Sequence, residues 1–263
     1  MNKPRRTFKL SGMIAPEDQF HQFTTTSPGN TTPDEHYLAP TTIPVQIISP
    51  PGIGTIGVPQ YSSTVNGPSS FYDPAGDCEG NFMSSRFQPN NNCYAYACNI
   101  ASNTFPQPGR KSGYLLTPAN MVGTVASVGA TVSSYAEKDG LILVGTTMEE
   151  VRAFTPPSNT EPGHFVALMI SPAGDANWQG DYHWARCSNS FTGCDEWSQK
   201  DGSDQITNFD FAGNFITDPS IANWTVNQGP VSNTDVSDMI TVYSFYCFMY
   251  ASNPSTTSVV NII

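Results

Sequence analysis

Proline and glycine are spread along the whole chain, and this feature restricts the fold most. The 263 residues include 22 prolines and 21 glycines, whereas only 13% of the residues are charged. Proline removes a backbone donor and disfavours helical conformation in the residue before it. The composition therefore favours a strand-rich and loop-rich protein over a helical bundle. The length suits one large domain, or a medium domain with an extension.

Residues 1–90 differ in composition from the rest of the chain. They are crowded with Pro, Thr, Ser, Asn and Gly, and only residues 43–48 have the apolar character of a short strand. A segment of this kind buries too little apolar surface to fold alone, and it becomes ordered only against something else. We therefore expect residues 1–90 to form an extended arm that anchors the chain to the protein subunits of a larger assembly. A folded domain is expected over residues 91–263.

The charge balance argues against nucleic acid as a partner of the folded domain. Twenty-two acidic and 11 basic side chains give a net charge of −11, which repels phosphate backbones. Neither a signal-peptide pattern nor a run approaching the roughly 18 apolar residues of a membrane span is present. We expect synthesis in the cytosol with reduced thiols, no membrane span, and a final location in a virion or an extracellular particle.

From residue 91 the expected elements are helices first and strands afterwards. Helices are predicted over 93–102, 117–129 and 147–154, and strands over 141–144, 164–171, 182–188, 195–199 and 241–250. The clearest strand is H-F-V-A-L-M-I-S at 164–171, which follows Pro-Gly and precedes Pro-Ala-Gly. This order indicates an α+β domain with an antiparallel sheet.

Cys93 lies at the predicted start of the first helix, in the run N-N-C-Y-A-Y-A-C. The unpaired N–H groups and the dipole at a helix N-terminus lower the pKa of a thiol from its usual value of about 8.5. Asn92 directly before it could cap the helix or donate a hydrogen bond to an oxyanion. A buried structural cysteine is the alternative interpretation, and it fits Cys98 better.

Two of the four histidines lie on the predicted sheet. His164 begins the strand at 164–171, and His183 lies on the next strand. On paired strands, both imidazoles could face the helix that carries Cys93 and act as general base and orienting group. The alternative is that each histidine only satisfies a local hydrogen bond. His21 and His36 lie in the arm and are expected to be spectators.

The order of helix-borne Cys93, strand-borne His164 and His183 on the next strand resembles the papain-like fold of NlpC/P60-type cell-wall amidases. The pieces N-C-Y-A-Y-A-C-N, T-F-P-Q-P-G-R, D-Y-H-W-A-R and W-S-Q-K-D-G are similar, in this order, to bacterial and phage proteins and to a mollusc insoluble shell matrix protein. The resemblance covers residues 90–250. It implies Cys93 as nucleophile, His164 as base and His183 as orienting residue, with Asp181 and Tyr182 as supporting residues.

One position departs from the pattern that the resemblance implies. Gln199, in W-S-Q-K, stands where relatives are expected to carry histidine, so the site of this copy could be degenerate. Two functions therefore stay open. One is a structural protein of a virion or particle that carries a papain-like Cys-His hydrolase domain. The other is an active cysteine amidase or peptidase that cuts amides in peptidoglycan or polypeptide.

Neither a cofactor nor a metal site is predicted. The cysteines at 93, 98, 187 and 194 lack the tight C-x-x-C spacing of structural zinc sites. Cys187 and Cys194 flank a predicted hairpin turn and could lie close enough for a disulfide if the protein leaves the cell. The G-x-G-x-x-G match at 52–57 is rejected as a phosphate site, because prolines on both sides prevent a helix from starting there. The tryptophans could line a glycan-binding cleft or pack in the core.

Overall fold

The computed structural model describes residues 45–48, 56–59, 91–100, 104–157, 163–174, 178–202, 206–230 and 238–252, together with Val260 and Ile262. Within the arm these ranges hold two short antiparallel strands, β1 (Val45–Ile48) and β2 (Ile56–Pro59). The strand predicted at 43–48 is confirmed over residues 45–48, and residues 43 and 44 lie outside the described residues. The end of the glycine motif at 52–57 is strand, which agrees with its rejection as a phosphate site. His21, His36 and the rest of the arm lie outside the described residues.

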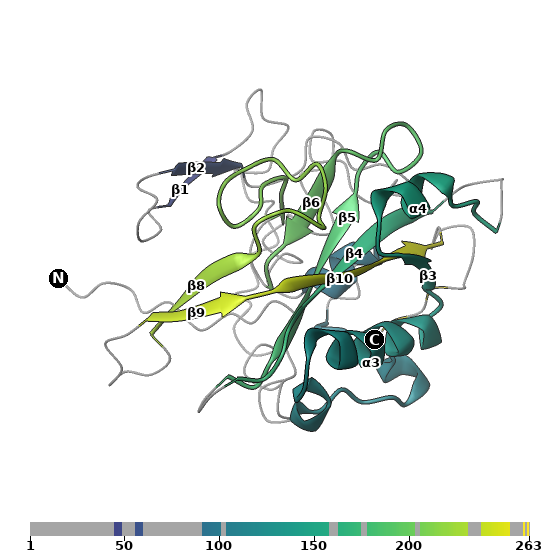
Figure 1. Ribbon diagram of the computed structural model, residues 1–263, viewed down its shortest axis with the longest axis horizontal. Helices are drawn as coiled ribbons and strands as arrows, with labels where there is room; N and C mark the ends of the chain where they lie inside the picture. The colour runs from purple at the N-terminus through teal and green to yellow at the C-terminus, as the bar shows by residue number, and fades with distance from the viewer. Residues whose placement is uncertain are drawn as a thin grey trace, which may run out of the picture.

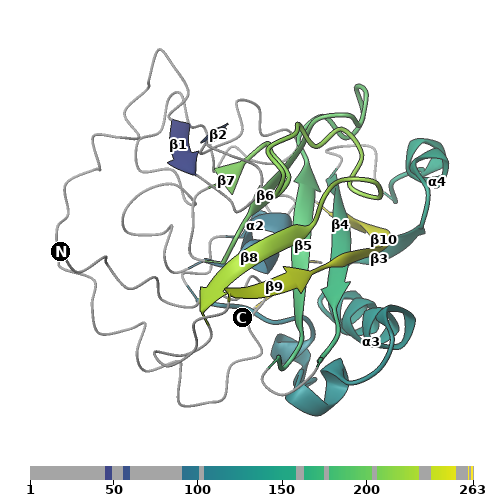
Figure 2. The same cartoon turned by 60° about the vertical axis from the view of Figure 1, so that its left-hand side comes forward.

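A six-stranded antiparallel sheet forms the centre of the α+β body, with the strand order β3-β10-β4-β5-β6-β7 (Figure 1). Its strands are β3 (Ile142–Gly145), β4 (His164–Ser171), β5 (Asp181–Cys187), β6 (Trp197–Lys200), β7 (Ile206–Thr207) and β10 (Ser244–Ala251). A separate two-stranded ribbon consists of β8 (Thr225–Pro230) and β9 (Asp238–Val242), and it crosses in front of the sheet in Figure 2.

Each α-helix follows a polar N-cap residue. The helices are α2 (Cys93–Ala97), α3 (Val125–Lys138) and α4 (Met148–Ala153), with 3-10 turns η4 (Arg110–Ser112) and η5 (Pro118–Met121). The side chains of Asn92, Thr124 and Thr147 accept hydrogen bonds from backbone N–H groups in the first turns of α2, α3 and α4. No helix of the described residues has the length and apolar character to span a membrane.

The sheet is covered on both faces, and alternate residues of each strand contribute to different cores. We call the face that carries α2 and α3 the helix face. Its core includes Val166, Leu168 and Ile170 of β4 and Tyr182 and Trp184 of β5. The opposite face packs against α4 and the segments around β8 and β9. Its core includes the alternate residues Phe165, Ala167, Met169, Ala185 and Cys187. This alternation decides which of the predicted site residues can meet.

Candidate functional site

Helix α2 presents the predicted nucleophile at its first residue, as expected from the sequence. Asn92 is the N-cap, and its Oδ1 accepts a hydrogen bond from the Ala95 N–H at 3.0 Å. Its Nδ2 donates to the Pro106 carbonyl at 2.9 Å. Both ends of the Asn92 amide are thus engaged within the fold, so an oxyanion role would require the Pro106 bond to break.

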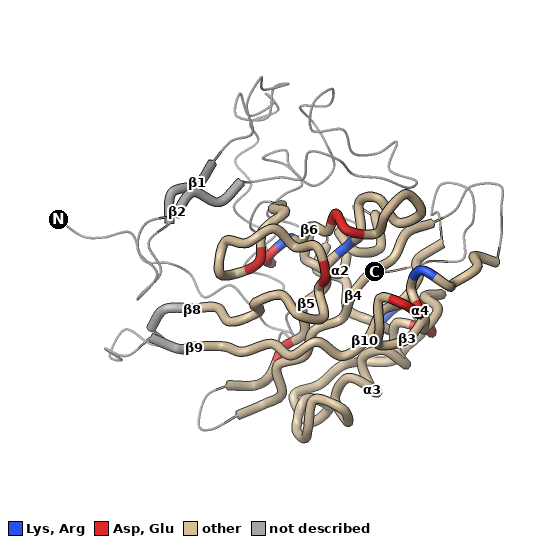
Figure 3. Tube along the Cα trace, turned by 45° about the horizontal axis from the view of Figure 1, so that its top comes forward, with Lys and Arg blue, Asp and Glu red and all other residues tan. Residues whose placement is uncertain are grey.

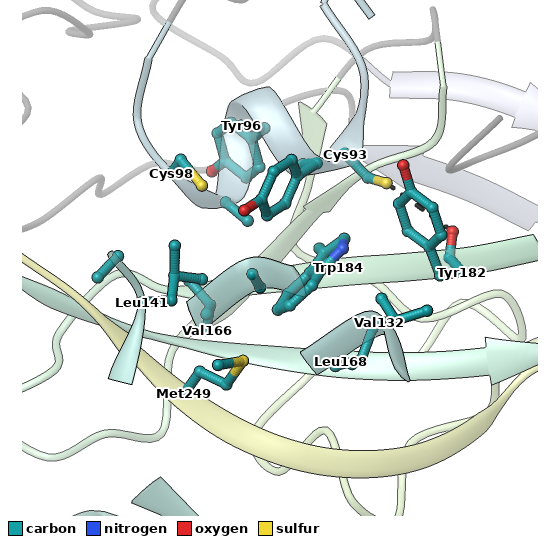
Figure 4. Close-up of a cluster of buried hydrophobic side chains, with 14 of the residues drawn as sticks. Cys93, Tyr96, Cys98, Val132, Leu141, Val166, Leu168, Tyr182, Trp184 and Met249 are labelled. Carbon is teal, nitrogen blue, oxygen red and sulfur yellow. Dashed lines mark hydrogen bonds between the residues drawn. The ribbon is translucent and has the colours of Figure 1, made fainter. Parts of the chain in front are cut away.

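The Cys93 side chain is completely buried against the strand β5 (Figure 4). Its Sγ lies 4.0 Å from the Tyr182 carbonyl oxygen, to which the thiol donates. Burial raises the pKa of the Cys93 thiol well above its usual range, and the nearby Asp181 adds to this. A hydrogen bond from the Trp184 backbone and the charge of Lys200 lower the pKa, but burial has the larger effect. The thiol is therefore protonated at neutral pH in this conformation.

His164 lies on the helix face, where it is bound to the far end of α2. Its Nε2 donates to the carbonyl oxygen of Ala97, the last residue of the helix, at 2.5 Å. Burial lowers the pKa of His164 to about 3, and the charge of Arg186 contributes. The imidazole is neutral, and it fixes the C-terminal end of α2 whereas Cys93 occupies the N-terminal end.

His183 lies on the opposite face of the sheet from α2. Its ring packs among Phe211, Trp224 and Tyr243, with centroid distances of 5.6, 5.5 and 5.8 Å. Its Nε2 donates to Oε1 of Gln199 at 2.6 Å. Burial lowers the pKa of His183 to about 3, so this imidazole is neutral as well. The residue that departs from the expected pattern, Gln199, is thus the direct partner of the predicted orienting histidine.

The two predicted supporting residues, Asp181 and Tyr182, are neighbours on β5 and point to opposite faces of the sheet. Asp181 accepts hydrogen bonds from the Tyr243 hydroxyl and from the Tyr182 backbone N–H, both at 2.8 Å. The Tyr182 ring lies on the helix face beside Cys93 (Figure 4). The structure therefore brings together Cys93, Tyr182 and Asn92, and it places His164 at the other end of α2 and His183 beyond the sheet. The catalytic roles of these residues stay predictions.

The sequence analysis did not include two buried cations near α2, Lys200 and Arg186, among the site residues. Lys200 donates from Nζ to the carbonyl oxygens of Asn91 and Gly202, at 2.5 and 2.7 Å. Arg186 donates to Asn99 Oδ1 at 2.8 Å, and its guanidinium lies 4.9 Å from the centre of the Tyr96 ring. The alternation in W-S-Q-K could have placed Lys200 on the same face as Ser198, which bonds Tyr96 on α2. These contacts join both sides of α2 to β5 and β6.

The described residues contain no group of three or more His, Cys, Asp or Glu side chains arranged to hold a metal ion. Three of the four tryptophans, Trp184, Trp197 and Trp224, are buried in the two cores, which favours packing over a glycan cleft. The side chains near Cys93 can thus donate and accept hydrogen bonds within the fold. Around Cys93 they form a close-packed hydrogen-bonded network in which the thiol and both histidines are neutral, rather than an ion pair of thiolate and imidazolium.

Comparison with known proteins identifies one informative relative. No protein-family model matches the chain, and no solved structure matches it. Insoluble matrix shell protein 1 of Ruditapes philippinarum is 35% identical over an alignment of 161 residues, which covers 57% of this chain and 86% of the relative. This confirms the shell-matrix part of the resemblance derived from the sequence. The chain belongs to the family of insoluble matrix shell protein 1.

Proposed function

We propose that this protein is a structural component of an insoluble assembly, either a virion or an extracellular particle. Residues 91–263 would be its folded block, and residues 1–90 would anchor it to neighbouring protein subunits. The name of the relative, an insoluble matrix shell protein, supports a role in such a material. Acidic residues outnumber basic ones, and Figure 3 shows the charged positions as short, separate segments along a mostly uncharged trace.

The observation that carries this proposal is the burial of the three predicted catalytic residues. Cys93, His164 and His183 are each 0% exposed, and each donates a hydrogen bond to an oxygen of the same chain. A hydrolase needs an accessible nucleophile with a base within hydrogen-bond reach. Here Cys93 and His164 instead bind α2 to the sheet, and His183 packs in the core of the opposite face. We infer a stabilising role for all three.

For the fold we propose a papain-like arrangement in which the role of the cysteine helix has become structural. Two features support this: α2 begins with Cys93, and it packs against the antiparallel strands β5 and β6, which follow β4 in the strand order. An experimentally determined structure that superimposes α2, β4, β5 and β6 on an NlpC/P60-type amidase would support the relationship. A different strand order would contradict it.

The decisive experiment is alkylation of the native full chain with iodoacetamide from pH 6 to pH 10. We expect Cys93 to react no faster than Cys98, because both thiols are buried and burial raises the pKa of each. Trypsin leaves both cysteines on one peptide, residues 87–110, and chymotrypsin then separates them after Tyr94 or Tyr96. Selective labelling of Cys93 with a midpoint below pH 8 would overturn the structural assignment.

The assembly role has its own measurement. Sedimentation velocity of the full chain over a wide concentration range should show self-association or co-sedimentation with the other proteins of its particle. A full chain that remains monomeric at every concentration and is absent from purified particles would contradict this part of the proposal.

A second candidate function is a cysteine amidase or peptidase that acts on peptidoglycan or polypeptide. The observation in its favour is the position of Cys93 at the first residue of α2, where the Trp184 backbone hydrogen bond lowers the thiol pKa. This candidate requires a conformation in which Cys93 is exposed and a histidine reaches it. Hydrolysis of cell-wall fragments by the wild type, lost in Cys93→Ala but kept in Cys98→Ala, would favour it over the structural role.

A further inference from the structure

The connection between β5 and β6 is a rigid turn organised by Asn189. Its Oδ1 accepts hydrogen bonds from the backbone N–H groups of Asp195 and Glu196, both at 3.0 Å. Its Nδ2 donates to Asp195 Oδ1 at 2.6 Å, and its carbonyl accepts from the Cys194 N–H at 3.1 Å. One asparagine thus fixes both arms of the turn. These hydrogen bonds hold the backbone on both sides of the turn in place, and with it the residues at the two ends.

Two cysteines stand at these ends, and their sulfur atoms face each other. Cys187 is the last residue of β5, and Cys194 precedes β6. Their Sγ atoms are 3.4 Å apart, and both side chains are buried. Cys194 has a left-handed backbone with φ of 56°, which turns its side chain toward β5. Its carbonyl also accepts a hydrogen bond from the indole of Trp197 at 3.3 Å, so the strained residue is fixed on both sides.

We propose that Cys187 and Cys194 form an intramolecular disulfide when the chain meets an oxidising environment. The two S–H bonds break and one S–S bond forms. The two electrons and two protons pass to a small disulfide oxidant such as glutathione disulfide, which leaves as two thiols. The sulfurs must approach by about 1.4 Å to reach the normal S–S bond length. This inference is independent of the proposed function, because it depends only on the turn.

Position and burial single out this pair among the described cysteines. Cys93 and Cys98 lie at the two ends of α2, and Cys247 lies in the helix-face core on β10. The sulfur atoms of Cys187 and Cys194, in contrast, are already in contact. Because both side chains are buried in the folded turn, an oxidant has little access to them there. Burial also raises the pKa of the Cys187 thiol. The bond therefore forms most readily during folding, before the turn closes.

The consequence would be a covalent clamp at the point where pairing of β5 with β6 begins. Cys187 is in register with Trp197, the first residue of β6. The clamp would hold the strand pair that carries Arg186 and Lys200, the two cations in contact with the α2 segment. The disulfide of a short loop stabilises mainly by restricting the unfolded chain. We expect the oxidised protein to melt about 5 °C above the reduced one.

The test uses the full chain with Cys78→Ser, since Cys78 lies outside the described residues and could pair elsewhere. The protein is refolded in a glutathione redox buffer, blocked with iodoacetamide and digested with trypsin. Cleavage after Arg186 and Lys200 releases residues 187–200 with both cysteines. We expect this peptide to be unalkylated and lighter by two hydrogen atoms. Chymotrypsin, which cuts after Phe191 and Trp197, should then give two cysteine-containing fragments that separate only on reduction.

The matched controls are Cys194→Ala and Cys247→Ser in the same background. Cys194→Ala should lose the redox dependence of the melting temperature, whereas Cys247→Ser should keep it. If Cys194→Ala does not fold, the mapping of the parent protein still decides the question. Alkylation of both cysteines after oxidative refolding, mixed disulfides with glutathione, or pairing of either cysteine with a different residue would each overturn the proposal.

Discussion

At the scale of single residues, the two buried histidines, His164 and His183, make the stability of the fold depend on pH in the same way. Burial lowers the pKa of each to about 3, whereas an unfolded histidine titrates near 6.5. Between these values the unfolded chain binds protons that the folded chain excludes. The stability that the neutral histidines contribute is therefore complete above pH 6.5 and is lost as the pH falls toward 3. Asp139 opposes this trend, because burial raises its pKa from 3.8 to about 6 and favours the folded state as the pH falls through this window.

We expect the free energy of unfolding to decrease by about 2–3 kcal/mol per histidine between pH 7 and pH 4.5. In His164→Gln, the amide can still donate to the Ala97 carbonyl but cannot titrate. Urea unfolding at a series of pH values should show a shallower slope for this variant, by about one proton. An unchanged slope would mean that His164 is solvated in the native state.

The pair of His183 and Gln199 gives a second residue-level prediction. Gln199 accepts from His183 and donates from Nε2 to the Phe209 carbonyl at 2.6 Å. Gln199→Leu would leave a buried donor and a buried acceptor without these partners, which costs about 2–4 kcal/mol. The exposed Glu137→Gln is the matched control and should change stability by less than about 0.5 kcal/mol. Equal urea midpoints for both variants would show that this pair does not stabilise the opposite core.

At the scale of elements, the accuracy of the sequence-based prediction followed the strength of the local signal. The strand at 164–171 is confirmed to the residue, because its apolar run is long and bounded by Pro and Gly. The helix predicted over 117–129 is wrong in its bounds: Pro118 starts only a 3-10 turn, Gly123 has φ of 140°, and α3 begins at Val125. The helix predicted over 93–102 ends at Ala97, shortly before Asn99 with its left-handed φ of 54°.

The prediction of the strands and of the site was limited because strand pairing and register are not encoded in the local sequence. The strand predicted over 241–250 is confirmed over 244–250 as β10, but its first two residues belong to β9, from which Tyr243 separates it. His164 and His183 were assigned to strands correctly, but their faces depend on the register between β4 and β5. Met169 pairs with His183 and shares its face, whereas His164 shares a face with Val166. A one-residue shift would reverse this result, and periodicity within one strand cannot detect it.

The cap of α2 provides the element-level prediction. Asn92→Ala removes the acceptor for the Ala95 N–H and the donor for the Pro106 carbonyl, both in a buried environment. We expect a loss of about 2–4 kcal/mol in chemical denaturation. Thr147→Ala, which removes the exposed cap of α4, should cost only about 1 kcal/mol. Equal losses would argue that burial adds nothing to the Asn92 cap.

At the scale of the whole molecule, the α+β class was predictable from the order of helices and strands. The boundary at residue 90 stays a prediction, because most of the arm lies outside the described residues. The return of the C-terminus to the helix-face core had no local signal in the sequence. Val260 and Ile262 are 4% and 7% exposed and pack in the same core as α2 and α3. The last residues therefore complete a core whose first members are residues 93–98.

We expect a chain that ends at residue 259 to lose about 3–6 kcal/mol of stability, since two apolar side chains leave the core. Ile221→Ser is the control, because Ile221 is 82% exposed and its replacement should be neutral. Thermal unfolding of the truncated and full chains measures the difference. An unchanged melting temperature would show that the C-terminal residues only cover the surface.

The complete enclosure of α2 has a consequence for the order of folding. A helix of five residues is not stable by itself in water, because nucleation costs more than so few hydrogen bonds return. Its partners lie far along the chain, with Lys200 separated from Asn91 by 109 positions. During synthesis, the Cys93 segment must therefore remain without its native contacts until β5 and β6 have left the ribosome. Such distant closure predicts slow folding, with formation of α2 among the last steps.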